Sequence, residues 1–268
     1  MLRLERQEKI LRQLSGQAYL SVEETASLLS ASVATVRRDF SDLADRGLAE
    51  RTRGGLRRLN GAEGHGLPFA LREVRYSREK AAMAEYAASL LAPDDVLMVD
   101  GGTTTYHLAR SLPDFPLKVI TNSLRLAAAF ADRRPTGSRT DVFVTGGYLF
   151  AESGLLAGPQ TVASLEQYHA RWTFLSPSGM TEEGVFNTNE FVVESERVMI
   201  ARADRVVVMA DPSKLGVRSM CRVGDIESVD TLITVASTGQ EAMLDRFREA
   251  GVEVVVLSPG GEPDGPSE

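Results

Sequence analysis

Apolar residues in the first forty-five positions recur every three to four residues, in three short runs separated by polar or glycine-containing breaks. This spacing predicts helices over residues 4–14, 22–29 and 33–45, each with one buried face. Ser21 and Ser32 stand directly before the second and third runs, where a hydroxyl can accept a hydrogen bond from the first turn, so both are predicted N-caps. The amino-terminal segment is therefore expected to be a small three-helix domain.

A short hairpin is predicted to follow the third helix. Gly47 is expected to end that helix, and residues 48–58 form two basic runs joined at Gly54-Gly55, a pair typical of a tight turn. Arg51 and Arg53 are expected to share one strand face, which gives the hairpin a basic edge. Such an edge suits contacts with a phosphate backbone.

The polar face of the third predicted helix combines short side chains with two arginines in its N-terminal half. A helix that enters the major groove needs this pattern, because its first turns must fit the groove and arginine can bond guanine edges or phosphates. The alternative is a generic three-helix domain with a solvated arginine face, but the arginine-rich hairpin directly after the helix favours DNA. The candidate DNA-binding residues are Ser32, Ala34, Thr35, Arg37, Arg38, Arg51 and Arg53.

Beyond residue 77 a helical pattern over 77–91 gives way to short, continuous apolar runs, most of them separated by further helical patterns. Runs of this kind predict parallel strands that are buried on both faces by helices. The predicted fold class is therefore α/β: an N-terminal winged helix-turn-helix plus a C-terminal, mostly parallel α/β domain. The predicted strands cover residues 96–99, 119–120, 142–144, 172–175, 206–209, 232–235 and 252–257.

Changes in composition give the predicted domain boundaries. Residues 1–60 form the DNA-binding domain, and residues 61–76, which begin with a stretch of Gly, Ala, Glu and His, are predicted to be a linker. Residues 77–257 form the α/β domain. Residues 258–268 are rich in Gly, Pro and acids and are predicted to be a disordered tail.

Polar and glycine residues follow three of the predicted strands. Asp100-Gly101-Gly102-Thr103-Thr104-Thr105 lies between a strand and a helix, where glycines let backbone amides approach an anion and threonines donate hydrogen bonds. This predicts a phosphate cradle that lacks the lysine of a Walker loop. The alternative is a tight turn with a capped helix. Thr121-Asn122-Ser123 and Thr145-Gly146-Gly147 end the next two strands, and all three ends can line one crevice.

The charge distribution agrees with this division. Residues 1–60 hold eleven Lys/Arg and eight Asp/Glu, a balance of +3, so the net charge of −7 leaves −10 for the remainder. A basic head on an acidic body is expected when only the head touches phosphates.

Other totals limit the chemistry and the compartment. A single cysteine, Cys221, and the absence of an export signal or an apolar run long enough for a membrane span predict a cytoplasmic protein that does not enter membranes. The three histidines are scattered along the chain, so neither a metal site nor a cofactor is expected. They are His65, His107 and His169.

The motifs of both halves resemble those of the DeoR family of transcriptional repressors. The resemblance implies a repressor whose sensor domain shares the fold of ribose-5-phosphate isomerase. A homo-oligomer, a dimer or a tetramer, is expected because one helix-turn-helix alone reads too few bases. Its head motif appears here as Val36-Arg37-Arg38-Asp39-Phe40, Leu43, Gly47-Leu48 and Arg53-Gly54-Gly55. Its sensor motifs appear as Lys80, Asp100 to Thr105, Thr121-Asn122-Ser123, Gly146-Gly147, Gly158-Pro159 and Ala210 to Lys214.

Site residues follow from the same resemblance. Asp100 to Thr105 would hold the phosphate of a sugar phosphate, with Gly146 and Gly147 in the same crevice. Asn122, Glu194 and Lys214 would lie near the sugar. Lys214 could also be a plain surface lysine, but its position just after a strand favours the site.

Two segments depart from the family pattern. Family members usually have G-A-D-G after the central strand, where this chain has Ser176-Pro177-Ser178-Gly179, and Lys-Arg before Met-Ile, where this chain has Glu196-Arg197. The first change removes a carboxylate at the place where isomerases use acids for proton transfer, and serine is a poor base. Both changes alter the polarity of the site, so the identity of the effector stays open.

These observations predict a DNA-binding transcriptional regulator of carbohydrate or polyol metabolism genes. Its expected partners are operator DNA and a phosphorylated sugar or polyol that releases the repressor. No catalytic residues and no enzymatic activity are expected. The rival hypothesis is a sugar-phosphate isomerase with a DNA-binding head, and the sequence does not decide between repressor and activator.

Overall fold

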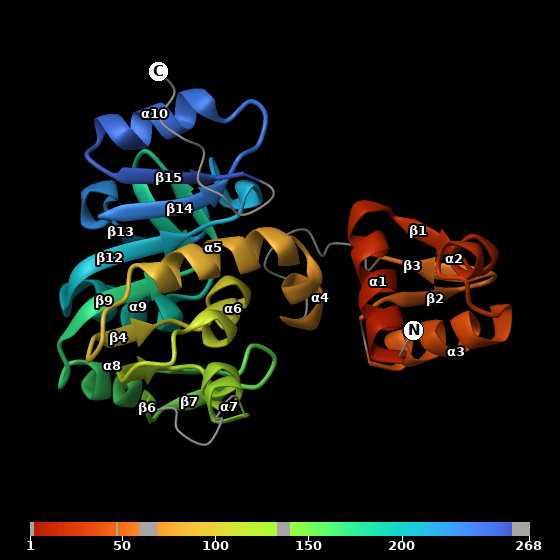
Figure 1. Ribbon diagram of the computed structural model, residues 1–268, viewed down its shortest axis with the longest axis horizontal. Helices are drawn as coiled ribbons and strands as arrows, with labels where there is room; N and C mark the ends of the chain where they lie inside the picture. The colour runs from red at the N-terminus through yellow and green to blue at the C-terminus, as the bar shows by residue number, and fades with distance from the viewer. Residues whose placement is uncertain (1–2, 47, 59–68, 133–139, 259–268) are drawn as a thin grey trace. The chain divides into compact units, whose positions relative to one another are not determined.

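The computed structural model describes residues 3–46, 48–58, 69–132 and 140–258 (Figure 1). The chain divides into two compact units, residues 1–77 and residues 78–268, which we call the head unit and the sensor unit. Each unit is described by itself. Gly47, residues 61–68 of the predicted linker and residues 259–268 of the predicted tail lie outside the described residues.

The head unit contains the three predicted helices and a small sheet. The helices are α1 (Arg3–Gly16), α2 (Val22–Leu28) and α3 (Val33–Asp45). The strands are β1 (Tyr19–Ser21), β2 (Glu50–Thr52) and β3 (Gly55–Arg57), antiparallel in the order β1-β3-β2. The short strand β1 was not predicted, because three residues are too few to show the alternation that identifies a strand.

Side-chain caps begin two of these helices, as the sequence predicts. The hydroxyl of Ser21 accepts a hydrogen bond from the amide of Glu24 at 3.2 Å, and that of Ser32 accepts one from the amide of Thr35 at 3.1 Å. Each bond satisfies a first-turn amide that has no partner within its helix. The bounds of α3 follow directly from this cap and from the apolar spacing behind it.

The hairpin β2–β3 is present, with one difference from the prediction. Gly54 has φ +95°, a conformation that favours glycine, and the turn that it forms includes Arg53. Arg53 is therefore at the turn and not on a strand face beside Arg51. A Cβ on Gly55 would lie 2.4 Å from the carbonyl oxygen of Leu20, so the close approach of β1 to β3 requires glycine there.

A fourth helix corrects the predicted linker. Residues 69–76 were assigned to it, but Phe69–Val74 form helix α4, whose Leu71 is 6% exposed and belongs to the core of the head unit. That core also contains Ile10 and Phe40, both fully buried. The apolar positions of α4 span less than two turns, too short a stretch for periodicity to reveal.

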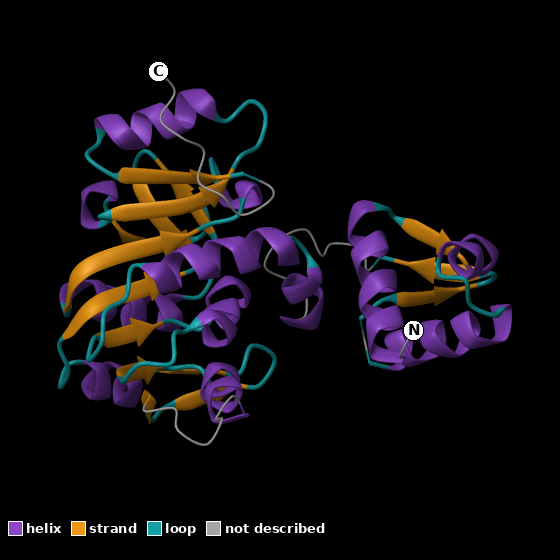
Figure 2. Cartoon of the chain, in the orientation of Figure 1, coloured by secondary structure: helices purple, strands orange, loops and turns teal. Residues whose placement is uncertain are grey.

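The sensor unit is built on a seven-stranded, fully parallel sheet (Figure 2). Its order is β15-β14-β12-β9-β4-β5-β6, so the direction of strand addition reverses at β4. Every predicted strand is present. The strands are β4 (Val96–Val99), β5 (Leu117–Thr121), β6 (Thr140–Val144), β9 (Ala170–Leu175), β12 (Ala203–Met209), β14 (Thr231–Val235) and β15 (Glu253–Leu257).

Two apolar cores lie on opposite faces of this sheet. Along β4, Leu97 and Val99 belong to one core, and Met98 belongs to the other. The first core receives side chains from α5 (Ser77–Ser89), α6 (Thr103–Ser111) and α7 (Leu124–Asp132). The second receives them from α8 (Pro159–Leu165), α9 (Glu190–Ala201) and α10 (Glu241–Glu249). Burial on both faces explains why the strands are continuous apolar runs.

Several small elements were not predicted. A hairpin joins β7 (Tyr148–Phe150) to β8 (Leu155–Ala157), and a three-stranded antiparallel sheet contains β10 (Gly179–Thr181), β11 (Gly184–Asn187) and β13 (Cys221–Gly224). The described part of the unit also contains the 3-10 turns η2 (Pro212–Lys214) and η3 (Ile226–Ser228). Among the described residues, no helix combines the length and the apolar character that a membrane span requires.

Candidate functional site

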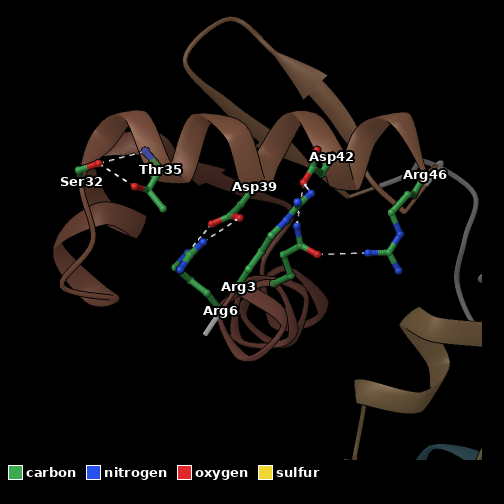
Figure 3. A network of polar contacts seen from close by, with 8 residues as sticks. Arg3, Arg6, Ser32, Thr35, Asp39, Asp42 and Arg46 are labelled. Carbon is green, nitrogen blue, oxygen red and sulfur yellow. Dashed lines mark hydrogen bonds and ion pairs between the residues drawn. The ribbon is translucent and has the colours of Figure 1, made fainter. Parts of the chain in front are cut away.

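The N-terminal half of α3 presents a polar, exposed face. Ala34, Arg37 and Arg38 are exposed there. The hydroxyls of Ser32 and Thr35 are 2.8 Å apart and belong to the cap (Figure 3). The cap therefore fixes the start of the helix, while the two arginines extend from its first turns.

The predicted DNA contact Arg51 has a second role in the head unit. Its guanidinium donates to the backbone carbonyl of Arg37 at 3.1 Å and lies 5.9 Å from the ring centre of Phe40. Arg51 thus ties strand β2 to helix α3. Arg53 is exposed at the tip of the hairpin.

A polar network on the inner side of α3 joins this helix to α1 (Figure 3). Arg6 makes two hydrogen bonds with the carboxylate of Asp39, one of them 3.1 Å long, and the Asp39 side chain is only 2% exposed. The hydrogen bond and the charge of Asp39 raise the pKa of Arg6 despite partial desolvation. Position 39 is the aspartate of the Arg-Arg-Asp motif, so one motif supplies both exposed arginines and an internal anchor.

The same network continues one turn further along α3. Asp42 accepts a hydrogen bond from the side-chain amide of Gln7 at 3.2 Å and forms an ion pair with Arg3. The guanidinium of Arg46 donates to the side-chain oxygen of Gln7 at 3.2 Å. These contacts were not predicted from the sequence. Their signal was the spacing of Asp39, Asp42 and Arg46 at i, i+3 and i+7, which places them on one side of a helix.

The predicted phosphate cradle lies at the end of β4 and the start of α6. The amide of Gly102 donates to the hydroxyl of Thr105 at 2.8 Å, so one of the three threonines serves as a helix cap. Thr103 receives a hydrogen bond from the ammonium of Lys80 at 3.0 Å, and both side chains are buried. The loop itself has no Walker lysine, but a cation reaches it from α5, over twenty residues upstream.

Gly101, the first glycine of the cradle, allows neighbouring elements to approach closely. A Cβ on Gly101 would lie 2.0 Å from a methyl group of Leu155 and 2.8 Å from the Cβ of Ser123. The amide of Gly101 donates to the side-chain oxygen of Asn122 at 3.2 Å, and the Asn122 amide donates to Asp100 at 3.0 Å. The structure therefore brings Asp100, Gly101 and Asn122 together, as expected.

A second carboxyl group lies beside Asp100 and comes from α9. Glu196 is 1% exposed, and its carboxyl group lies close enough to Asp100 for each group to affect the pKa of the other. Its Oε1 accepts from Asn187 at 2.8 Å, and Asn187 accepts from the hydroxyl of Ser178 at 2.8 Å. The two positions that depart from the family pattern, 178 and 196, are therefore joined through one asparagine.

Burial perturbs both carboxyl groups. It raises the pKa of Asp100 to about 6, although hydrogen bonds from Asn122, Gly101 and Glu196 oppose the rise. Burial also raises the pKa of Glu196 well above its usual range, and the charge of Asp100 adds to this effect. Both shifts favour the neutral form of a carboxyl group in this pair.

Two glutamates of α9 differ in their burial. Glu194 is exposed, whereas Glu196 is the buried glutamate beside Asp100. Residues two apart on a helix point to nearly opposite sides, so only one of the two can face the sheet. Of the two glutamates, Glu196 is therefore the one beside Asp100, and a role of Glu194 near the sugar stays a prediction.

The remaining predicted residues lie at other strand ends. Gly146 follows β6, and its carbonyl accepts from Thr161 at 2.6 Å. Gly147 has φ +133°. Lys214 is half-buried at the end of η2, after β12, which is two strands from β4. Within the described ranges, no group of three or more His, Cys, Asp or Glu is placed to hold a metal ion.

Two family models match the chain. The DeoR-like helix-turn-helix domain matches residues 6–61, and the DeoR C terminal sensor domain matches residues 75–235, more than half of the chain. The chain belongs to the DeoR family. This DeoR-family protein is therefore a DNA-binding transcriptional regulator.

Relatives in this family match along most of their length. The uncharacterized HTH-type transcriptional regulator YulB of Bacillus subtilis (strain 168) is 34% identical over 87% of this chain and 89% of its own. The HTH-type transcriptional regulator GlpR of Haloferax volcanii is 34% identical over 95% of this chain and 98% of its own.

Among solved structures, the ribose 5-phosphate isomerase A of Methanocaldococcus jannaschii matches 52% of this chain and 55% of its own, at 16% identity and a TM-score of 0.38. A structural likeness of this size carries no argument.

Proposed function

We propose that this DeoR-family protein is a cytoplasmic repressor that binds operator DNA through its head unit and is released by a phosphorylated sugar or polyol. The observation that carries the proposal is the pairing, in one chain, of an exposed arginine face on α3 with a buried, lysine-containing cradle at the start of α6. The first is suited to nucleic acid and the second to a phosphorylated metabolite.

On the DNA side, Arg37 and Arg38 contact base edges or phosphates from the first turns of α3, and Ala34 keeps this part of the helix narrow. Arg53 reaches the phosphate backbone from the hairpin tip, and Arg51 sets the hairpin against the helix through its bond to the carbonyl of Arg37. One such head reads too few base pairs for a specific operator. The protein therefore acts as a homo-oligomer whose heads occupy repeated half-sites.

On the effector side, the phosphate is held by the amides at the start of α6, by the hydroxyls of Thr103 and Thr104, and by the ammonium of Lys80. The positive end of the helix and a buried cation both favour a dianion. Asn122, Gly146, Gly147 and Lys214 lie at strand ends that face the sugar. Ligand binding favours a form of the oligomer that no longer matches the operator, which requires a coupling of about 1–3 kcal/mol.

Electrophoretic mobility shift with DNA from upstream of the encoding gene tests this proposal. Retardation by the intact protein should be relieved by a phosphorylated sugar or polyol and not by the same compound without its phosphate. If retardation occurs but no phosphorylated metabolite changes it, the effector part of the proposal is wrong.

One observation favours a second candidate function, the isomerisation of a sugar phosphate. Asp100 and Glu196 form a buried carboxyl pair with raised pKa values beside the cradle, a feature shared by many catalytic sites. Aldose–ketose conversion of pentose phosphates by the purified protein, abolished in Glu196→Gln, would establish this activity. We rank it second because Ser178 stands where the family has an aspartate.

A further inference from the structure

We infer that two copies of this chain associate through the β6 edge of the sensor unit, with β6 of one copy antiparallel to β6 of the other. This inference rests on the proposed function, which requires a homo-oligomer, and it goes further by naming the surface. The surface consists of exposed apolar side chains on β6, on β7 and at the starts of α7 and α9, and we call it the edge patch. Its members are Leu124, Phe143, Val144, Tyr148, Leu149 and Phe191.

The edge patch is one continuous surface. The ring centre of Phe150 lies 5.0 Å from that of Tyr148 and 6.4 Å from that of Phe191, so β7 and α9 meet there. The amide of Leu124 donates to the carbonyl of Gly154 at 2.9 Å, which joins the start of α7 to the β7–β8 hairpin. Figure 1 shows β6 and β7 at the lower end of the sensor unit, opposite α10. Of the eight large apolar side chains that are exposed in the described part of this unit, six belong to the patch.

Strand β6 has the features of an edge that is covered in the assembled protein. It is the last strand of the sheet, so one side of its backbone pairs with no other strand among the described residues. Phe143 and Val144 point to opposite faces of the sheet, yet they are 40% and 43% exposed, so neither helical layer covers this end of β6. Exposed edges are normally protected by charges, prolines or bulges. Residues 140–150 contain a single charged side chain, Asp141, and no proline.

A second copy of the chain fits this edge better than DNA or lipid does. Nucleic acids and anionic membranes attract surfaces that are rich in Lys and Arg, and residues 140–150 contain neither. An edge strand can pair with the same strand of a second copy about a two-fold axis perpendicular to the sheet, which makes the two strands antiparallel and continues the sheet across both copies. Homodimer interfaces are also rich in aromatic residues and poor in charged ones at their centre.

The size of the edge patch matches what a stable dimer needs. Its six members are between 40% and 69% exposed. At roughly 200 Å² for a fully exposed large side chain, they offer on the order of 500–600 Å² of apolar surface. A stable interface buries about 800 Å² on each partner, and about two thirds of the surface buried in a homodimer is apolar. The patch therefore supplies the apolar part of such an interface.

Two elements of the edge patch also reach the effector site. The β7–β8 hairpin places Leu155 against the cradle, where a Cβ on Gly101 would lie 2.0 Å from a Leu155 methyl group. Helix α9 carries Phe191 in its first turn and, further along, Glu196 beside Asp100. A ligand that shifts the hairpin or α9 thus acts directly on the contact between the two copies.

Sedimentation equilibrium of the intact protein at micromolar concentration tests this inference. The wild type should have the mass of at least two chains, and Tyr148→Glu should reduce that mass to half or less. The dissociation constant should rise at least ~100-fold, because each copy would bury an unpaired carboxylate on association. Tyr148 is the most exposed member of the patch, so the variant should keep the circular dichroism of the wild type. Leu149→Lys, which places the opposite charge at a neighbouring member, should give the same result.

Met220→Glu is the matched control. Met220 is 73% exposed and lies outside the edge patch, in the loop before β13, so the same new charge there should leave the mass of the wild type unchanged. A monomeric wild type would overturn the inference. So would variants Tyr148→Glu and Leu149→Lys that keep the mass of the wild type, or a loss of mass in Met220→Glu equal to that in Tyr148→Glu.

This inference and the proposed function fail in different ways. If the wild type is an oligomer whose mass Tyr148→Glu does not change, the edge patch is wrong, while operator retardation and its relief by a phosphorylated compound still support the proposed function. If Tyr148→Glu halves the mass but the wild type retards no operator DNA, the surface is right and the proposed function is wrong.

Discussion

Truncation of Arg6 should destabilise the head unit by roughly 2–4 kcal/mol. Its guanidinium makes two hydrogen bonds with Asp39, and the side chains of the two residues are 12% and 2% exposed. Removing one partner of a buried pair costs about 3–5 kcal/mol, mainly because the other charge is left buried and uncompensated. We take a lower range for Arg6→Ala because the arginine retains some exposure.

Two signals distinguish the units in a thermal unfolding experiment. Trp172 is the only tryptophan of the chain and lies on β9, so its fluorescence reports the sensor unit, whereas circular dichroism at 222 nm reports both units. For a domain of 60–100 residues, 1 kcal/mol shifts the midpoint by about 4–8 °C. Arg6→Ala should therefore lower the head transition by ~10 °C or more and leave the tryptophan transition in place.

Arg3→Ala is the matched control, because Arg3 pairs with Asp42 on the same two helices but is 66% exposed. Pairs of this kind contribute about 0–1 kcal/mol. A cost of less than ~1 kcal/mol for Arg6→Ala, or equal effects of the two variants, would contradict the stabilising role of the buried pair.

Three other predictions concern DNA, phosphate and protons. Arg38→Ala should weaken operator binding by about 1–3 kcal/mol in a mobility-shift titration while leaving the tryptophan transition unchanged, and unchanged affinity would remove Arg38 from the interface. Lys80→Met should raise the dissociation constant for sorbitol 6-phosphate at least ~10-fold by calorimetry, because a charge-assisted bond to phosphate is lost, and an unaltered constant would exclude that bond. The sensor unit should also gain stability in mild acid, because burial raises the pKa of Asp100 from 3.8 to about 6 and the folded state then holds a proton that the unfolded chain releases. That contribution is fully present below pH 3.8 and is lost as the pH rises through 6. The difference in unfolding free energy between wild type and Asp100→Asn, which has no carboxyl group at this position, should therefore change between pH 5 and 7.5, and a constant difference would contradict the raised pKa of Asp100.

Local signals in the sequence were sufficient to predict most of the fold. Ser32 and the apolar spacing behind it gave the bounds of α3, and burial on both faces made the inner strands of the large sheet visible apolar runs. Helix α4 and strand β1 escaped prediction because each is too short to show a period. Their positions depend on contacts with other elements, such as that of Leu71 with the core of the head unit.

The candidate site could be predicted only where it is contiguous in sequence. Asp100 and the glycines after it form one motif, and Asn122 follows the next strand, so parallel strand ends brought them together as expected. Lys80 and Glu196 reach the same place from helices far away in sequence, and no spacing rule connects them to the cradle. The choice between Glu194 and Glu196 depended on which face of α9 is buried.

The hydrogen bonds through Asn187 have a consequence for how this site can change during evolution. A lone substitution Ser178→Asp would add a third carboxyl group beside the buried pair Asp100 and Glu196, whose own pKa values are already raised by burial. A lone substitution Glu196→Lys would supply a cation with only Asp100 to balance it. Positions 178 and 196 are thus expected to mutate as a pair. The combination of aspartate with lysine and the combination of serine with glutamate are both favourable, whereas a variant with only one of the two substitutions is less favourable than either.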